Sequence, residues 1–206
     1  MATDSYVHKT VAGNRGGPLL FAFHGTGGDE NQFLGLGPDL LPGAKVVAPR
    51  GDVSEHGAAR YFRRTGEGVY DMADLSRATA KMADFVRAHV EEAGPSTVIG
   101  LGYSNGANIL ASVLFHAPSL FDAAVLMHPL IPFTPHVEGD LSSTRVLVTA
   151  GKRDPICPPA LTVELDRALR DLSADVELFW HDGGHEIREG ELTAAGAFLA
   201  PYRPAA

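Results

Sequence analysis

Residues 101–108 read Leu-Gly-Tyr-Ser-Asn-Gly-Ala-Asn; they follow an apolar run and precede a predicted helix over 105–116. The pattern Gly-x-Ser-x-Gly between a strand and a helix is typical of a nucleophile elbow, a sharp turn that presents a serine hydroxyl. Gly102 and Gly106 would let the two arms of the turn pass without Cβ clashes. An ordinary glycine- and serine-rich turn is the alternative, but the flanking strand and helix favour the elbow. We therefore expect Ser104 at the carboxyl edge of a sheet, in a strained backbone conformation.

Strand and helix patterns alternate along the rest of the chain. The run 19–23 is wholly apolar, as expected of a strand covered on both faces, and 71–92 carries the apolar stripe of a helix. The segment 53–70 has no clear period and is either a functional loop or poorly ordered. The alternation predicts one α/β domain over 1–206, with a mostly parallel central sheet and helices on both faces. Further strands are expected at 6–11, 45–48, 97–101, 123–127, 145–150 and 175–180, and further helices at 31–41, 158–172 and 189–199.

The composition excludes several classes of protein. The chain has 206 residues and a net charge of −8 without a basic run, which argues against nucleic-acid binding because phosphates are neutralised by Lys and Arg. Cys157 is the only cysteine, so an internal disulfide is impossible and a reducing compartment is expected. The sequence has neither a signal-peptide pattern nor an apolar stretch approaching about 18 residues. We expect a cytoplasmic protein with no stable membrane association, a monomer or a homodimer.

A serine nucleophile needs a base and a carboxylate that orients the base. Asp154 follows the predicted strand 145–150, and His185 follows a double glycine after the next strand, so both can reach the edge where Ser104 lies. His181 competes for the role of base and Asp182 for that of acid. His181 follows its strand directly and fits a polar strand end better. Ser104, His185 and Asp154 are therefore the expected catalytic triad.

The first glycine-rich loop, 24–30, reads His-Gly-Thr-Gly-Gly-Asp-Glu. A phosphate-binding loop is excluded because the Walker pattern ends in Gly-Lys-Ser/Thr, whereas carboxylates end this one. An oxyanion needs two donors, and we expect the backbone N–H of Asn105 and that of Thr26 to supply them. His24 is expected to hold the loop by hydrogen bonds. The nine histidines are scattered without a metal-binding spacing, so neither a metal nor a cofactor is expected.

These motifs resemble the phospholipase/carboxylesterase family of α/β hydrolases, in order and spacing along nearly the whole chain. The family includes acyl-protein thioesterases and small bacterial carboxylesterases, and the Gly-Tyr-Ser-Asn-Gly-Ala form looks most like the latter. The resemblance implies the α/β-hydrolase fold without a cap domain, the triad and oxyanion donors given above, and a small-molecule ester substrate. Asn105 stands where acyl-protein thioesterases typically carry glutamine, which weakens the case for protein or lysophospholipid substrates. Dienelactone hydrolases are relatives that use cysteine as nucleophile, but Cys157 lies far from the elbow.

Loops at the active edge must form the substrate pocket. Phe133 and Ile156 could line an acyl or aromatic pocket, or they could simply bury loop against core. Arg63, with Arg60 and Arg64, could bind a carboxylate or phosphate of the substrate. The alternative is that these arginines pair with Glu55, Glu67 and Asp71 on the surface.

The sequence thus predicts a metal-independent serine hydrolase that cleaves small carboxylic esters or thioesters through an acyl-enzyme. Two other functions stay open. One is a non-catalytic small-molecule receptor on a hydrolase fold, since fold alone does not fix function. The other is action on a different acyl bond, as in an acyl-protein thioesterase or a lysophospholipase.

Overall fold

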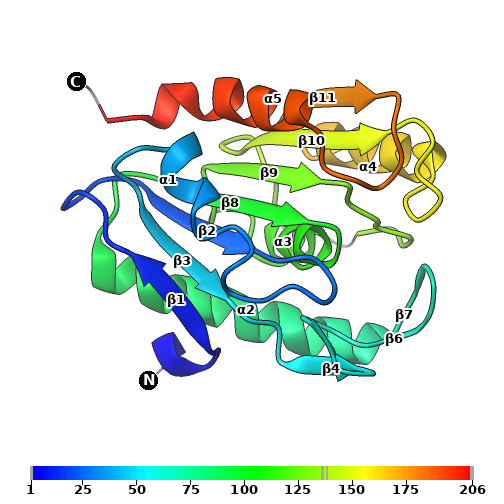
Figure 1. Ribbon diagram of the computed structural model, residues 1–206, viewed down its shortest axis with the longest axis horizontal. Helices are drawn as coiled ribbons and strands as arrows, with labels where there is room; N and C mark the ends of the chain where they lie inside the picture. The colour runs from blue at the N-terminus through cyan, green and yellow to red at the C-terminus, as the bar shows by residue number, and fades with distance from the viewer. Residues whose placement is uncertain (1, 136, 138, 205–206) are drawn as a thin grey trace.

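The computed structural model describes residues 2–135, 137 and 139–204. Its centre is a seven-stranded sheet with the order β1-β3-β2-β8-β9-β10-β11 (Figure 1). Only β1, at one edge, runs antiparallel to its neighbour, and the other six strands are parallel. The strands are β1 (His8–Val11), β2 (Leu19–Phe23), β3 (Lys45–Pro49), β8 (Val98–Tyr103), β9 (Ala123–Met127), β10 (Arg145–Gly151) and β11 (Asp175–His181).

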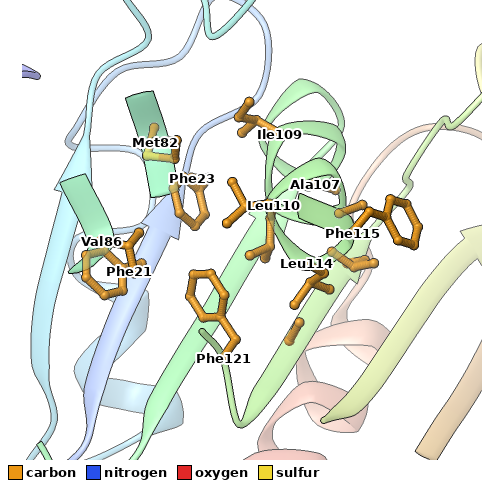
Figure 2. Packing of buried hydrophobic residues seen from close by; sticks show 14 of the residues in the cluster. Phe21, Phe23, Met82, Val86, Ala107, Ile109, Leu110, Leu114, Phe115 and Phe121 are labelled. Carbon is orange, nitrogen blue, oxygen red and sulfur yellow. The ribbon is translucent and has the colours of Figure 1, made fainter. Parts of the chain in front are cut away.

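Two apolar layers lie on opposite faces of this sheet, because side chains alternate along each strand. In β2, Phe21 and Phe23 belong to the layer under α2 (Met72–Ala93) and α3 (Asn105–His116) (Figure 2). Residues of α4 (Pro159–Asp171) also contribute to this layer. Leu20 and Ala22 point the other way, into the layer covered by α1 (Leu36–Leu40) and α5 (Glu189–Leu199). The predicted α/β-hydrolase architecture, a mostly parallel sheet between helices, is confirmed.

Most element boundaries agree with the sequence pattern, and two segments differ. The helix expected at 31–41 is confined to Leu36–Leu40, with turns before it, since glycine and proline interrupt the segment. The segment 53–70 forms two small hairpins, so of the two alternatives given for it, a functional loop or a poorly ordered segment, the second is wrong. The hairpins are β4 (Val53–Glu55) with β5 (Ala58–Arg60), and β6 (Arg64–Gly66) with β7 (Val69–Tyr70); short 3-10 helices cover Ala2–Asp4 and Ala200–Tyr202.

Within the described ranges, none of the helices has the length and apolar character needed to cross a membrane.

Candidate active site

Ser104 lies at the turn between β8 and α3, in the geometry of a nucleophile elbow. Its backbone angles are φ 52° and ψ −117°, which a residue with a side chain rarely adopts. The turn is so compact that a Cβ on Gly106 would collide with the backbone of Phe23, and a Cβ on Gly102 would lie 2.5 Å from the Gly106 carbonyl oxygen. The glycines therefore hold β2, β8 and the start of α3 in close contact below the serine.

A chain of hydrogen bonds joins the three predicted triad residues. His185 Nε2 lies 2.9 Å from Ser104 Oγ, and His185 Nδ1 lies 2.7 Å from Asp154 Oδ2. The three residues follow β8, β10 and β11, whose parallel carboxyl ends meet at one edge of the sheet. Tyr103 donates from its hydroxyl to the His185 carbonyl at 2.7 Å and so holds the histidine loop over the serine.

Asp154 is buried, and its hydrogen bonds favour the ionised carboxylate. Its Oδ1 accepts the backbone N–H groups of Ile156 and Cys157 at 2.8 and 2.9 Å, and its Oδ2 faces the ring nitrogens of His185 and His128. Burial alone would raise the pKa of this carboxyl, but the hydrogen bonds from Cys157, His128 and His185 outweigh burial and lower it. A carboxylate here fixes the His185 tautomer, with the proton on Nδ1 and the lone pair of Nε2 toward Ser104.

The competing acid and base lie elsewhere. The Asp182 side chain is 82% exposed and pairs with Lys152 at 2.8 Å. His181 Nε2 lies 3.2 Å from Glu191 Oε2, beneath the site. Neither contacts Ser104 or His185 in the hydrogen bonds of the described residues.

Thr26 and Asn105 border the same cavity as Ser104 and His185. Asn105 is the first residue of α3, so the helix itself does not use its backbone N–H. Its side-chain Oδ1 accepts the Tyr61 N–H at 2.8 Å, which fixes the helix start against the segment 53–70. His24 holds the glycine-rich loop, as expected: its Nδ1 lies 2.7 Å from the Gly25 carbonyl and its Nε2 accepts the Gly51 N–H at 2.8 Å.

The cavity in front of Ser104 has a volume of about 270 Å³. Ile156 is among its lining residues, as expected, together with Leu130 and Tyr70. Its cationic side chains are Arg60 and Arg64, both paired with Glu55, at 3.3 and 3.0 Å.

Arg63 and Phe133 lie away from this cavity, contrary to expectation. Arg63 turns outward to Asp71 and Asp74, at 3.5 and 3.2 Å, and its side chain is 63% exposed. Phe133 lines separate hollows beside α4 and α2. The sequence-based alternative for the arginines, pairing with nearby carboxylates, is confirmed by these contacts and by the Arg64–Glu67 pair at 2.7 Å.

Comparison with known proteins identifies the family. The model of the Dienelactone hydrolase family matches residues 33–188. The chain belongs to this family. This dienelactone hydrolase family member is 40% identical over 179 residues to the putative hydrolase MhqD of Bacillus subtilis (strain 168), covering 86% of the chain and 90% of the relative.

Solved structures agree with this assignment. A Bacillus cereus carboxylesterase is 35% identical, with a TM-score of 0.90 over 95% of this chain and 93% of that one. The protein Atu2452 of unknown function from Agrobacterium tumefaciens is 61% identical, with a TM-score of 0.94 over 98% and 99% of the two chains. A phospholipase/carboxylesterase from Dyadobacter fermentans, 18% identical with a TM-score of 0.76, shares the fold. The family member is thus a hydrolase of the dienelactone hydrolase and carboxylesterase type.

In this family member the elbow carries a serine, and the cysteine lies beside Asp154, the predicted triad acid. The Cys157 thiol donates to the His128 carbonyl at 3.2 Å and is buried, and burial raises the pKa of the thiol. A thiol held protonated in this way is a poor nucleophile.

Two buried residues of the site, His128 and Glu191, were not predicted from the sequence. His128 follows β9 directly, and its side chain lies between Asp154 and Glu191, at 2.9 and 3.0 Å. A polar residue at the carboxyl end of a buried strand was the available signal for His128. Nothing in the α5 sequence pointed to Glu191.

Two groups of side chains among the described residues have metal-ligand spacing: His128, His181 and Glu191, and His128, Asp154 and His185. In the first group, the Gly183 N–H donates to His181 Nδ1 at 3.0 Å, so the proton of a neutral His181 lies on Nε2, the atom that would have to bind the metal. In the second group, His185 Nε2 faces Ser104, and Asp154 already accepts four hydrogen bonds. Both groups are better explained as hydrogen-bonded networks.

Proposed function

We propose that this hydrolase is a serine carboxylesterase acting on small carboxylic esters or thioesters. The observation that carries the proposal is the continuous hydrogen-bonded chain from Ser104 Oγ through His185 to Asp154. Three side chains in this order on three strand ends match what acyl transfer requires: a nucleophile, its base and the group that orients the base.

In the proposed reaction, Ser104 Oγ attacks the substrate carbonyl carbon while His185 Nε2 takes the hydroxyl proton. The tetrahedral oxyanion accepts hydrogen bonds from the backbone N–H groups of Thr26 and Asn105. Collapse breaks the bond to the alkoxide or thiolate, which leaves with the proton from His185. Water, deprotonated by His185, then attacks the acyl-enzyme, and Ser104 regains its proton. Asp154 stabilises the imidazolium that forms twice in this cycle.

The cavity supports a small substrate. Its volume of about 270 Å³ lies at or below the lower end of the range for small-molecule sites, which is roughly 300–1,000 Å³. Leu130 and Ile156 supply apolar walls, whereas Arg64 and Glu67 make one side charged. Short acyl chains fit this space better than the long chains of lysophospholipids.

Turnover of p-nitrophenyl esters from acetate to octanoate tests the proposal. We expect the highest kcat/KM with short chains, and a loss of the order of a thousandfold or more in kcat for Ser104→Ala. Ser76→Ala, on the exposed face of α2, is the matched control and should leave kcat unchanged. Equal activity of wild type and Ser104→Ala would exclude the serine mechanism. Tight binding of an ester without turnover would favour the receptor function.

A further inference from the structure

His128 occupies a position that the proposed mechanism does not use. It is fully buried at the end of β9 and adopts a left-handed backbone conformation with φ 51°. Its N–H donates to the Thr149 carbonyl at 2.9 Å, which fixes this turn against β10. A residue with a side chain is uncommon in this conformation, and a polar ring is costly in a dry interior, so the partners of His128 must compensate for both costs.

Both ring nitrogens of His128 face carboxylate oxygens. Nδ1 lies 2.9 Å from Asp154 Oδ2, and Nε2 lies 3.0 Å from Glu191 Oε1. A carboxylate can only accept a hydrogen bond, so two ionised carboxyls favour a proton on each nitrogen. His181 Nε2 also faces His128 Nε2, but at 3.4 Å it lies farther away than the Glu191 oxygen.

Glu191 is surrounded by donors, which favours its ionised form. Its Oε1 accepts the Thr149 hydroxyl at 2.6 Å, and its Oε2 accepts the Arg188 N–H at 2.7 Å. The His181 Nε2–H, fixed by the Gly183 N–H on the other ring nitrogen, adds a donor 3.2 Å from Oε2. Burial would raise the pKa of Glu191, but its hydrogen bonds to His128, Thr149 and Arg188 outweigh burial and lower it.

We propose that His128 is a doubly protonated imidazolium between Asp154 and Glu191. It positions the triad carboxylate, and its charge weakens the stabilisation that this carboxylate gives to a positive charge on His185. The inference rests on the proposed function for its kinetic consequence, but not for the protonation state itself. Burial would lower the pKa of His128, and the bonds to Glu191 and Asp154 outweigh burial and raise it.

The imidazolium acts on His185 through a shared atom. Asp154 Oδ2 accepts a hydrogen bond from both histidines, and the two ring centroids are 5.1 Å apart. A fixed positive charge at this distance repels a second positive charge on the His185 ring. Among the described residues, the other polar and titratable groups that contact these two histidines include Ser104, Tyr103, Cys157, His181 and Glu191.

Replacing His128 by glutamine removes the charge. The repulsion of a positively charged His185 is then lost, while the glutamine amide can still donate to one of the two carboxylates. We expect the acidic limb of the kcat/KM profile for p-nitrophenyl acetate to move to higher pH by about one unit. His116→Gln, at the exposed end of α3, is the matched control and should leave the limb in place. If kcat falls in His128→Gln while the limb stays unmoved, His128 is only a packing residue and the proposal fails.

The protonation state can be measured on the wild-type protein, so the test survives if His128→Gln does not fold. In 15N-labelled protein at about pH 8, NMR spectra assigned through the ring carbons should show protons on both Nδ1 and Nε2 of His128. The same result is expected for Ser104→Ala, which separates this inference from the hydrolase mechanism. An unprotonated ring nitrogen on His128 at that pH would overturn the proposal, whatever the esterase assays show.

Discussion

Arg60 donates a hydrogen bond from Nη1 to the hydroxyl of Thr26, at 2.7 Å. This contact ties the end of β5 to the glycine-rich loop after β2. The Arg60 guanidinium is almost fully buried, lies 3.3 Å from Glu55 and also donates from Nε to the Phe62 carbonyl. The segment 53–70 thus anchors the loop that would supply one of the two oxyanion donors.

Arg60→Gln should therefore weaken catalysis through Thr26. The loop would lose its anchor, so the Thr26 N–H would no longer be held where negative charge develops, and we expect kcat to fall about tenfold or more. Thr26→Ala keeps the backbone N–H but loses the same hydrogen bond. The double variant should be no slower than Arg60→Gln alone, because both changes remove one interaction. If the fold losses in kcat of the two single variants multiply in the double variant, Arg60 and Thr26 do not act through one interaction.

Arg64 and its sequence neighbour Arg63 provide a test of substrate charge. Arg64 lines the cavity and Arg63 points outward, although the two carry the same side chain. If the cavity binds an anionic group, Arg64→Gln should lower kcat/KM for p-nitrophenyl hydrogen succinate about tenfold relative to p-nitrophenyl butyrate. Arg63→Gln should leave that ratio unchanged. A ratio that is the same in wild type and both variants would show that Arg64 serves only its pairs with Glu55 and Glu67.

The contrast between these two arginines shows what the sequence could and could not predict. Ser104, Asp154 and His185 were found because chain order and strand ends place them at one edge of a parallel sheet. The side of the hairpin on which Arg63 or Arg64 lies depends on strand register and on a bulge between β6 and β7. The hydrophobic pattern of the sequence does not determine how strands of only two or three residues pair.

His128 and Glu191 were missed for a different reason. They lie far apart in the sequence, and their pairing depends on the first turn of α5 lying against the residues that end or follow β9 and β11. α5 is predominantly apolar, so Glu191 looked like an ordinary acidic residue in the first turn of a helix. Local periodicity predicts which face of a helix is buried, but not which polar group that face meets.

The packing of the elbow predicts which glycines are indispensable. In Gly106→Ala the new Cβ would collide with the Phe23 backbone, which cannot move without shifting β2. We expect the free energy of unfolding to fall by about 3 kcal/mol, measured by urea denaturation, with esterase activity lost in parallel. Gly35→Ala is the matched control, because a Cβ there meets no atom within 4 Å. Wild-type stability in Gly106→Ala would show that the elbow can relax.

The burial of His24 makes the free energy of unfolding depend on pH. The ring is buried and neutral, with Nε2 accepting the Gly51 N–H, and burial lowers its pKa from the ordinary 6.5. The unfolded chain then binds the proton more readily, so this stabilisation is complete above about pH 6.5 and is lost as the pH falls below it. His24→Gln keeps an acceptor for Gly51 but does not titrate. Its Tm should therefore fall less than that of the wild type between about pH 7 and pH 5, as followed by circular dichroism. Parallel Tm curves for the two proteins would show that His24 is not the group responsible.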